Sequence, residues 1–156
     1  MKGNPKIHKL LNEVLKAELT AINQYFVHAK MCQNWGYDRL FEKVYAESID
    51  EMKHADKLVD RILFLEGTPN MTDYFKINIG DDVKKQLEND LALEESAIPR
   101  LNVGVQTCLE EGDGGTRELL EHILVDEEEH ADWLEIQLRL IKEIGIEAYL
   151  AEQMKK

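Results

Sequence analysis

Two related stretches decide the fold of this chain: Asp50-Glu51-Met52-Lys53-His54-Ala55-Asp56-Lys57-Leu58 and Asp126-Glu127-Glu128-Glu129-His130-Ala131-Asp132-Trp133-Leu134. Six of the nine positions are identical, and the second stretch begins 76 residues after the first (126 − 50 = 76). In each stretch a Glu and a His stand three residues apart, a spacing that places both side chains on one face of a helix. The repeat therefore predicts two helices that present the same Glu-x-x-His pair.

A single glutamate precedes each Glu-x-x-His pair at the same distance. Glu18 stands 33 residues before Glu51 (51 − 18 = 33), and Glu94 stands 33 residues before Glu127 (127 − 94 = 33). The single glutamates are themselves separated by the repeat offset (94 − 18 = 76). The sequence thus predicts a duplicated helical hairpin with a metal site between its halves. The candidate metal ligands, which are also the candidate catalytic residues, are Glu18, Glu51, His54, Glu94, Glu127 and His130.

Hydrophobic periodicity predicts four long helices and a short fifth one. Glycine-containing segments separate them, as is typical of helix ends. Pro99 lies inside the third helix, where a proline should produce a kink. The expected helices run from Pro5 to about Asn34, from Asp38 to Gly67, from Asp81 or Asp82 to the turn at Gly112, from Thr116 to Gly145, and from Ile146 to about Gln153.

The connection between the second and third helices, residues 67–81, is long enough to cross the whole bundle. Its 15 residues span at most about 50 Å, whereas a helix of ~29 residues is about 43 Å long. In antiparallel hairpins each single Glu would face its own Glu-x-x-His pair, because both are equally far from the turn. We therefore expect one all-α domain over residues 1–156, a ferritin-like four-helix bundle with a long crossover loop and a short fifth C-terminal helix.

Composition excludes several classes of protein. The 156 residues include 19 Lys+Arg and 31 Asp+Glu, and the net charge of −12 argues against binding to nucleic-acid phosphates. The acidity fits either a plain acidic surface or a surface that gathers cations. No apolar run approaches the ~20 residues of a membrane span, and no apolar signal-peptide region is present. Because Cys32 and Cys108 are isolated, we expect a cytoplasmic protein without a disulfide framework.

The chemistry of the six candidate ligands favours a pair of metal ions. All six lie on stripes that face the core, where unpartnered carboxylates cost several kcal/mol each or take up protons. Four carboxylates carry a charge of −4, which two divalent cations cancel while both imidazoles stay neutral. Oxygen-rich ligands with two imidazoles suit iron or manganese, whereas structural zinc favours thiolates. The same ligand set is known from ferritin-like di-iron proteins, and the metal is identified by that match.

Several neighbouring residues have secondary roles in this interpretation. Asp50 and Asp126 precede the two Glu ligands and can accept the free imidazole N–H of the opposite half's histidine. Glu47 lies on the ligand stripe, but Ile123 occupies the position 76 residues later, so we place Glu47 at the rim of the site. Tyr25 is either a core residue or a contact of the ligands. A single Glu-x-x-His pair is usually exposed, but six residues with one shared offset are hard to explain that way.

The sequence resembles the bacterioferritins over nearly its whole length. The matching segments are Met1-Lys2-Gly3, Ala21-Ile22-Asn23-Gln24-Tyr25-Phe26, Glu47-Ser48-Ile49-Asp50-Glu51-Met52-Lys53-His54-Ala55-Asp56 and Arg61-Ile62-Leu63-Phe64-Leu65-Glu66-Gly67. The resemblance implies a shell of twenty-four subunits, built from two-fold dimers, that oxidises Fe(II) with O2 at a di-iron centre and stores ferric mineral. All six ferroxidase ligands of the family are present. It also implies haem b between two subunits, held by one Met from each, which maps onto Met52.

The position of Met52 also suits an interface on physical grounds. It follows Glu51, so its side chain points about 100° away from the ligand stripe. Its neighbours form a second apolar strip, which one bundle core cannot cover and which is a candidate two-fold interface. A Met there fits plain interface packing as well as haem ligation, and the family resemblance favours haem. The strip comprises Tyr45, Ile49, Ala55 and Val59 on the second helix and Leu19, Ile22 and Phe26 on the first.

The chain departs from the bacterioferritin pattern at some positions. Ala46 stands where many members have a His that is linked, with the acid at Asp50, to an inner-surface iron site, so the resemblance does not imply that site here. The segments 68–76 and 110–116 also differ from common members. The family's reductant is a ferredoxin-type partner that docks near the haem. The resemblance implies such a partner for this chain.

Two other functions stay open at this point. One is a di-iron peroxidase resembling rubrerythrin, although the chain has no C-x-x-C segment of the rubredoxin type. The other is a shell subunit that binds haem or metal structurally and turns over slowly. Assembly size, together with Fe²⁺-dependent O2 consumption, distinguishes the three.

Overall fold

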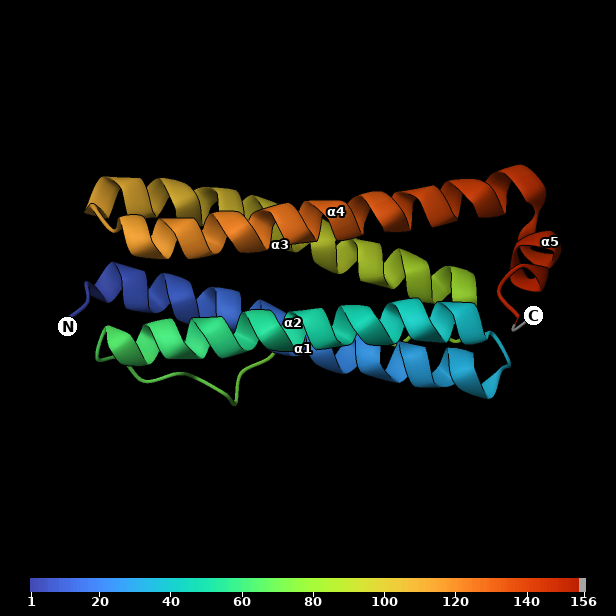
Figure 1. Cartoon of the computed structure of the whole chain (residues 1–156), viewed down its shortest axis with the longest axis horizontal. Coiled ribbons are helices and arrows are strands. Elements are labelled where there is room, and N and C mark those ends of the chain that lie inside the picture. The colour runs from blue at the N-terminus through green and yellow to red at the C-terminus, as the bar shows by residue number, and fades with distance from the viewer. Residues whose placement is uncertain (155–156) are drawn as a thin grey trace.

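The computed structural model describes residues 1–154, and every regular element in that range is an α-helix. Two hairpins, α1 with α2 and α3 with α4, lie side by side, and α5 lies at the end of the bundle where α4 finishes (Figure 1). The expected all-α bundle with a long crossover and a short fifth helix is confirmed. The helix bounds are α1 Pro5–Asn34, α2 Asp38–Phe64, α3 Val83–Glu111, α4 Gly114–Ile144 and α5 Ile146–Ala151.

Local sequence explains where the long helices begin and end. Asn4, Asp82 and Asp113 each accept a hydrogen bond from a backbone N–H in the first turn of α1, α3 and α4, with N···O distances of 2.8, 2.8 and 2.9 Å. Gly112 follows α3 with a φ of 69°, a left-handed conformation that residues with a Cβ rarely adopt. The helix continues through Pro99. The positions of these helix ends determine how far along the bundle each side chain lies.

The apolar core is divided by a polar layer near the middle of the bundle. One cluster, which includes Leu11, Leu58 and Leu120, fills the half that contains the start of α1. Another, which includes Leu40 and Leu134, fills the half that contains the end of α1. The six candidate ligands lie on the same four helices between these clusters. Apolar packing on both sides therefore holds the helices that carry them.

The crossover segment, residues 65–82, is fastened by four buried polar side chains. Three of them stand one turn apart on α1 and accept the backbone N–H groups of Phe75, Asn78 and Gly80 at 2.9, 3.0 and 3.0 Å. The fourth, on α3, accepts hydrogen bonds from two of the three at 2.8 Å each. The crossover is therefore fixed to both hairpins. The three side chains on α1 are those of Thr20, Gln24 and His28, and the one on α3 is that of Asp90. We call these four residues the crossover cluster.

Cys32 and Cys108 are both buried and carry free thiols. Burial raises the pKa of the Cys32 thiol to about 12 and that of Cys108 to about 11. Across residues 1–154, none of the helices combines the length and the apolar character that a membrane crossing requires.

Candidate metal centre

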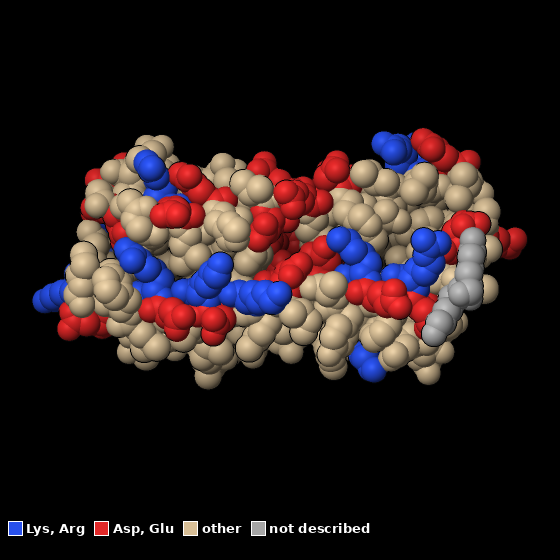
Figure 2. All heavy atoms as spheres, viewed as in Figure 1, with Lys and Arg blue, Asp and Glu red and all other residues tan. Residues whose placement is uncertain are grey.

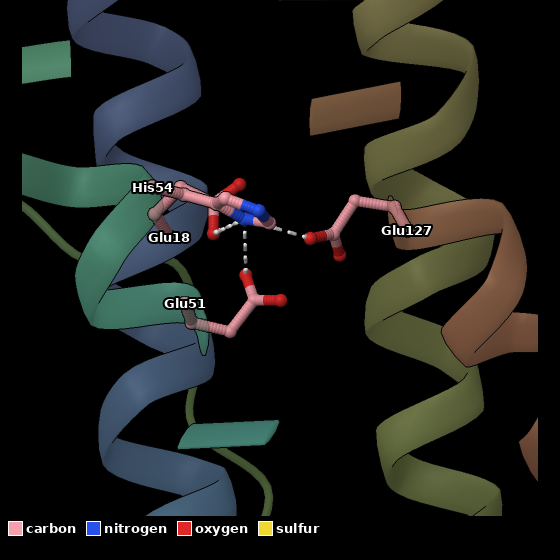
Figure 3. A group of neighbouring side chains, drawn as sticks. All are labelled: Glu18, Glu51, His54 and Glu127. Carbon is pink, nitrogen blue, oxygen red and sulfur yellow. Dashed lines mark ion pairs between the residues drawn. The ribbon is translucent and has the colours of Figure 1, made fainter. Parts of the chain in front are cut away.

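A buried cluster of one histidine and three carboxylates forms where α1, α2 and α4 meet (Figure 3). His54 Nδ1 lies 3.6 Å from Glu18 Oε2 and 3.8 Å from Glu51 Oε2. The same nitrogen lies 3.2 Å from Glu127 Oε1, on the opposite hairpin. One ligand atom of each residue lies within 4.8 Å of the others. Oxygen and nitrogen atoms that converge in this way can hold a metal ion.

A second group adjoins the first and shares Glu51 with it. His130 Nδ1 lies 3.1 Å from Glu94 Oε1 and 3.7 Å from Glu47 Oε2. Glu47, Glu51 and His130 offer ligand atoms within 4.8 Å of one another. The Tyr25 hydroxyl donates a hydrogen bond to Glu94, so Tyr25 is both a core residue and a contact of the cluster. The structure thus brings together all six residues that the repeat predicts, with Glu47 at their edge.

All six are at most 5% exposed, yet several of their polar atoms have no hydrogen-bond partner among the described residues. Leaving a buried donor or acceptor unpaired costs roughly 1–3 kcal/mol, and more when the group is charged. Such atoms in a folded protein need an explanation, and a bound cation supplies one. The atoms without a hydrogen-bond partner are Glu18 Oε2, His54 Nδ1, Glu94 Oε2 and Glu127 Oε1, although His54 Nδ1 lies at ion-pair distance from Glu18 Oε2 and Glu127 Oε1.

Burial shifts the acidity of three of the carboxyl groups. Burial, reinforced by the negative charge of Glu127, raises the pKa of Glu18 to about 7. Burial also raises the pKa of Glu51 well above its usual range, and the charge of Glu18 adds to the effect. The pKa of Glu127 rises for the same reasons, with Glu51 as the main neighbour. Without a bound cation, these three carboxyl groups therefore keep their protons to higher pH than ordinary carboxyl groups do.

The pKa values of the other three groups depend on burial and on the groups that surround them. Burial opposes the charged form of His54, but the carboxylates of Glu127, Glu18 and Glu51 outweigh burial and raise its pKa. The same balance raises the pKa of His130, whose main partner is Glu94. Burial opposes ionisation of Glu94, but its hydrogen bonds, first with Glu127 and then with His130, hold its pKa below the usual value. Metal ions would replace the protons of this cluster, so their binding should release protons.

The predicted contacts of the two histidines with Asp126 and Asp50 differ in outcome. His54 Nε2 lies 2.8 Å from Asp126 Oδ2, as expected, and this contact leaves Nδ1 free to face the cluster. No hydrogen bond or ion pair joins Asp50 to His130 in the part of the chain that the structure describes, so that prediction is wrong. The Asp50 side chain instead is exposed and lines the groove between α2 and α4.

Met52 lies outside this centre, on an exposed face of α2. The residue is 55% exposed in the single chain. Ala55 and Leu19, which the sequence assigns to the apolar strip, are buried in the bundle core instead, because α1 and α2 pack together there. The strip is thus narrower than predicted. Its exposed large members are Phe26, Tyr45, Ile49 and Met52.

Two residues near the centre were not predicted from the sequence. Arg100 on α3 and Phe75 on the crossover line a pocket that reaches the candidate ligands. The Arg100 guanidinium carbon lies 4.6 Å from the centre of the Phe75 ring. No spacing rule relates these positions, since the crossover alone brings them together.

Comparison with known proteins agrees with this geometry. The ferritin-like domain family matches residues 8–144. A bacterioferritin of Mycolicibacterium paratuberculosis is 48% identical over 152 residues, 97% of this chain and 96% of the relative. A bacterioferritin of Brucella melitensis is 45% identical over 149 residues (96% and 92%), and one of Streptomyces coelicolor is 44% identical over 151 residues (97% and 90%). The chain therefore belongs to the ferritin-like family and, within it, to the bacterioferritins.

Proposed function

We propose that the chain oxidises Fe(II) to Fe(III) with O2 at the buried carboxylate and histidine cluster. Two Fe²⁺ ions lose one electron each, and O2 takes up both electrons with two protons, so that 2 Fe²⁺ + O2 + 2 H⁺ gives 2 Fe³⁺ + H2O2. The observation that carries the proposal is the set of nitrogen and oxygen atoms without hydrogen-bond partners in a buried cluster. Two iron ions held by this cluster would share this two-electron reaction.

Charge and position support a division of the six ligands between two iron ions. Glu18 and His54 would hold one ion, and Glu94 and His130 the other. Glu51 is placed to serve both, because it belongs to both groups of ligand atoms. The fourth carboxylate, Glu127, contacts His54 and also pairs with Glu94, so it too can bridge. Four carboxylates cancel the charge of two Fe²⁺ ions.

Membership of the bacterioferritins supports a role in iron storage. We further propose that the ferric product is kept as mineral inside a shell of twenty-four subunits built from two-fold dimers. The exposed strip of Phe26, Tyr45, Ile49 and Met52 supports such an interface, because apolar side chains gathered on one face favour a partner surface. A self-complementary contact would cover the strip on both subunits at once.

The same strip can hold haem b. The side chain of Met52 is exposed among apolar and aromatic side chains, and with a two-fold contact one Met52 from each subunit would hold the haem. When bound, the haem would supply a path for electrons that reduce stored iron for release. A ferredoxin-type reductant is the proposed electron donor.

One experiment tests the assembly and the reaction together. Size-exclusion chromatography with absorbance at protein and Soret wavelengths should show a twenty-four-subunit particle that carries haem. Adding Fe²⁺ in air should consume about one O2 for every two Fe²⁺ in the fast phase. An assembled particle with slow O2 consumption would mean a structural metal site. Fast consumption of H2O2 with little use of O2 would mean a peroxidase.

The haem assignment has its own test. Met52→Leu keeps an apolar side chain of similar size, so the dimer and the rate of Fe²⁺ oxidation should persist while the Soret band is lost. A bis-thioether haem spectrum in this variant would show that another residue is the ligand.

A further inference from the structure

The candidate metal centre is reached through two openings on different faces of the bundle. One is a pocket of about 220 Å³ between α1, α3 and the crossover, which we call the α1/α3 pocket. The other is a groove of about 480 Å³ between α2 and α4, which we call the α2/α4 groove. Both include candidate ligands among their walls. The two openings can therefore admit different reactants to the same ions.

The charged residues around the two openings differ in sign. In the α1/α3 pocket, every acidic residue of the described lining is a candidate ligand, and the remaining charged residues are Lys76 and Arg100. The α2/α4 groove adds acidic residues that are not among the six. Figure 2 shows acidic side chains gathered around the hollow at mid-bundle. Three lysines also line the groove, leaving a negative balance. The additional acids are Glu47, Asp50, Asp56, Asp126 and Glu129.

Phe75, from the crossover, is the one aromatic residue in the described lining of the α1/α3 pocket. Two cationic groups lie over its ring, Lys16 Nζ at 4.3 Å and Arg100 Cζ at 4.6 Å from the ring centre. The backbone N–H of Phe75 donates to the buried hydroxyl of Thr20, which fixes this part of the crossover to α1. Many of the other lining residues are small, and Ala97 is among them. The unpaired oxygens of Glu18 and Glu94 belong to residues that form the inner wall.

We propose that the α1/α3 pocket admits the small uncharged oxidant, O2 or H2O2, and that Arg100 and Lys76 bar Fe²⁺ from it. The inference rests on the proposed ferroxidase function. A divalent cation that sheds water beside two fixed positive charges meets repulsion, whereas O2 and H2O2 carry no charge. The acidic α2/α4 groove would then supply Fe²⁺. With peroxide the balanced reaction is 2 Fe²⁺ + H2O2 + 2 H⁺ giving 2 Fe³⁺ + 2 H2O.

Two variants, each placed in one opening, separate loading from oxidation. Ala97→Leu narrows the α1/α3 pocket one turn beyond Glu94 without removing a ligand, and Ala97→Ser is its matched small control. Glu129→Lys reverses one charge in the α2/α4 groove. The whole assembled protein is first loaded without oxygen, using Co²⁺ to follow filling by absorbance. Fe²⁺-loaded protein is then mixed rapidly with O2 in one arm and H2O2 in the other.

Ala97→Leu should still bind two Co²⁺ per subunit at a rate within about twofold of the parent, and should slow oxidation of loaded iron by about tenfold with both oxidants. Glu129→Lys should slow Co²⁺ filling and leave the oxidation of loaded iron near the parental rate. Arg100→Glu, which needs no added volume, should speed Co²⁺ filling and restore it in Glu129→Lys. The inference is overturned if Ala97→Leu slows filling and spares oxidation, or if Arg100→Glu leaves filling unchanged. A parent protein that binds no Co²⁺ would instead refute the ferroxidase function itself.

Discussion

The metal centre and the crossover cluster are both buried groups of polar side chains, and both use α1 and α3. They differ in how many of their hydrogen bonds the protein completes. In the crossover cluster, Gly80 N–H donates to His28 Nε2, so His28 Nδ1 carries the proton that it donates to Asp90. Within residues 1–154, no buried polar atom of this cluster lacks a partner, whereas the metal centre leaves such atoms on Glu18, His54, Glu94 and Glu127.

This difference separates structural from functional polar groups in one bundle. A completed network holds the crossover in place and leaves nothing for a ligand to satisfy. An incomplete network that is buried and rich in carboxylates is tolerated because cations complete it. Burial alone does not distinguish the two, since His28 is 1% exposed and His54 is 4% exposed.

The largest effect is expected from removing one of the candidate metal ligands, since no other side chain takes its place. Glu94→Ala should slow the fast oxidation of Fe²⁺ by about a thousandfold while the shell still assembles, because one ion loses its carboxylate. Stopped-flow absorbance measures the rate. Glu95→Ala, an exposed neighbour on α3, is the matched control and should oxidise iron normally. A parental rate in Glu94→Ala would place the chemistry elsewhere.

Breaking the completed network should affect stability instead. Asp90→Ala leaves the Gln24 amide and the His28 Nδ1–H buried without their acceptor, which should lower the free energy of unfolding by about 3 kcal/mol. Denaturant unfolding of the metal-free protein measures the loss, and faster hydrogen exchange at Asn78 and Gly80 would locate it. Exposed Asp81 provides the control Asp81→Ala. Unchanged unfolding in Asp90→Ala would mean that the cluster does not hold the crossover.

A smaller effect is expected at the edge of the metal centre, at the hydrogen bond between Asp126 and His54. Asp126→Asn removes the carboxylate that orients the imidazole, so affinity for Co²⁺ should fall about tenfold. Titration of the metal-free protein followed by absorbance gives the affinity. Asp132→Asn, on the exposed side of the same helix, should bind like the parent. Equal affinities in both variants would show that His54 needs no such support.

The smallest effect is a dependence of thermal stability on pH that is confined to the metal centre. Because the folded-state pKa of Glu18 is about 7 and its ordinary value is 4.5, folding retains a proton that the unfolded chain releases. The resulting stability is present below pH 4.5 and lost as pH rises through about 7. Glu51 and Glu127 act in the same direction. The melting temperature of the metal-free protein should therefore fall by a few degrees as pH rises through this window.

Metal ions should reverse this trend, since they compete with the same protons and stabilise the folded state more as pH rises. Calorimetry with a chelator and with Co²⁺ compares the two slopes. Glu18→Gln should flatten the slope of the metal-free protein, whereas Asp90→Ala should lower the melting temperature similarly at every pH. A parental slope in Glu18→Gln would mean that another group binds the proton.

Much of the fold was predictable because its signals are local. Helix boundaries agree with the structure to within a few residues, although α4 begins at Gly114 and not at Thr116, and α5 ends at Ala151 and not near Gln153. Those ends depend on which side chain caps the helix, as Asp113 does for α4. The crossover cluster was missed because the partners of Gln24 and His28 lie more than fifty residues away along the chain.

By itself the sequence determined the bundle and its six candidate ligands, because one repeat offset and helical periodicity relate Glu18, Glu51 and His54 to their copies. Only the tertiary structure decided which neighbours complete the site. It gave Asp126 a bond to His54 and left Asp50 exposed, although both occupy the same place in the repeat. It also set the crossover against α1 and α3 and so made two openings of different charge. Such contacts depend on how separate helices pack, and spacing along one helix does not encode that packing.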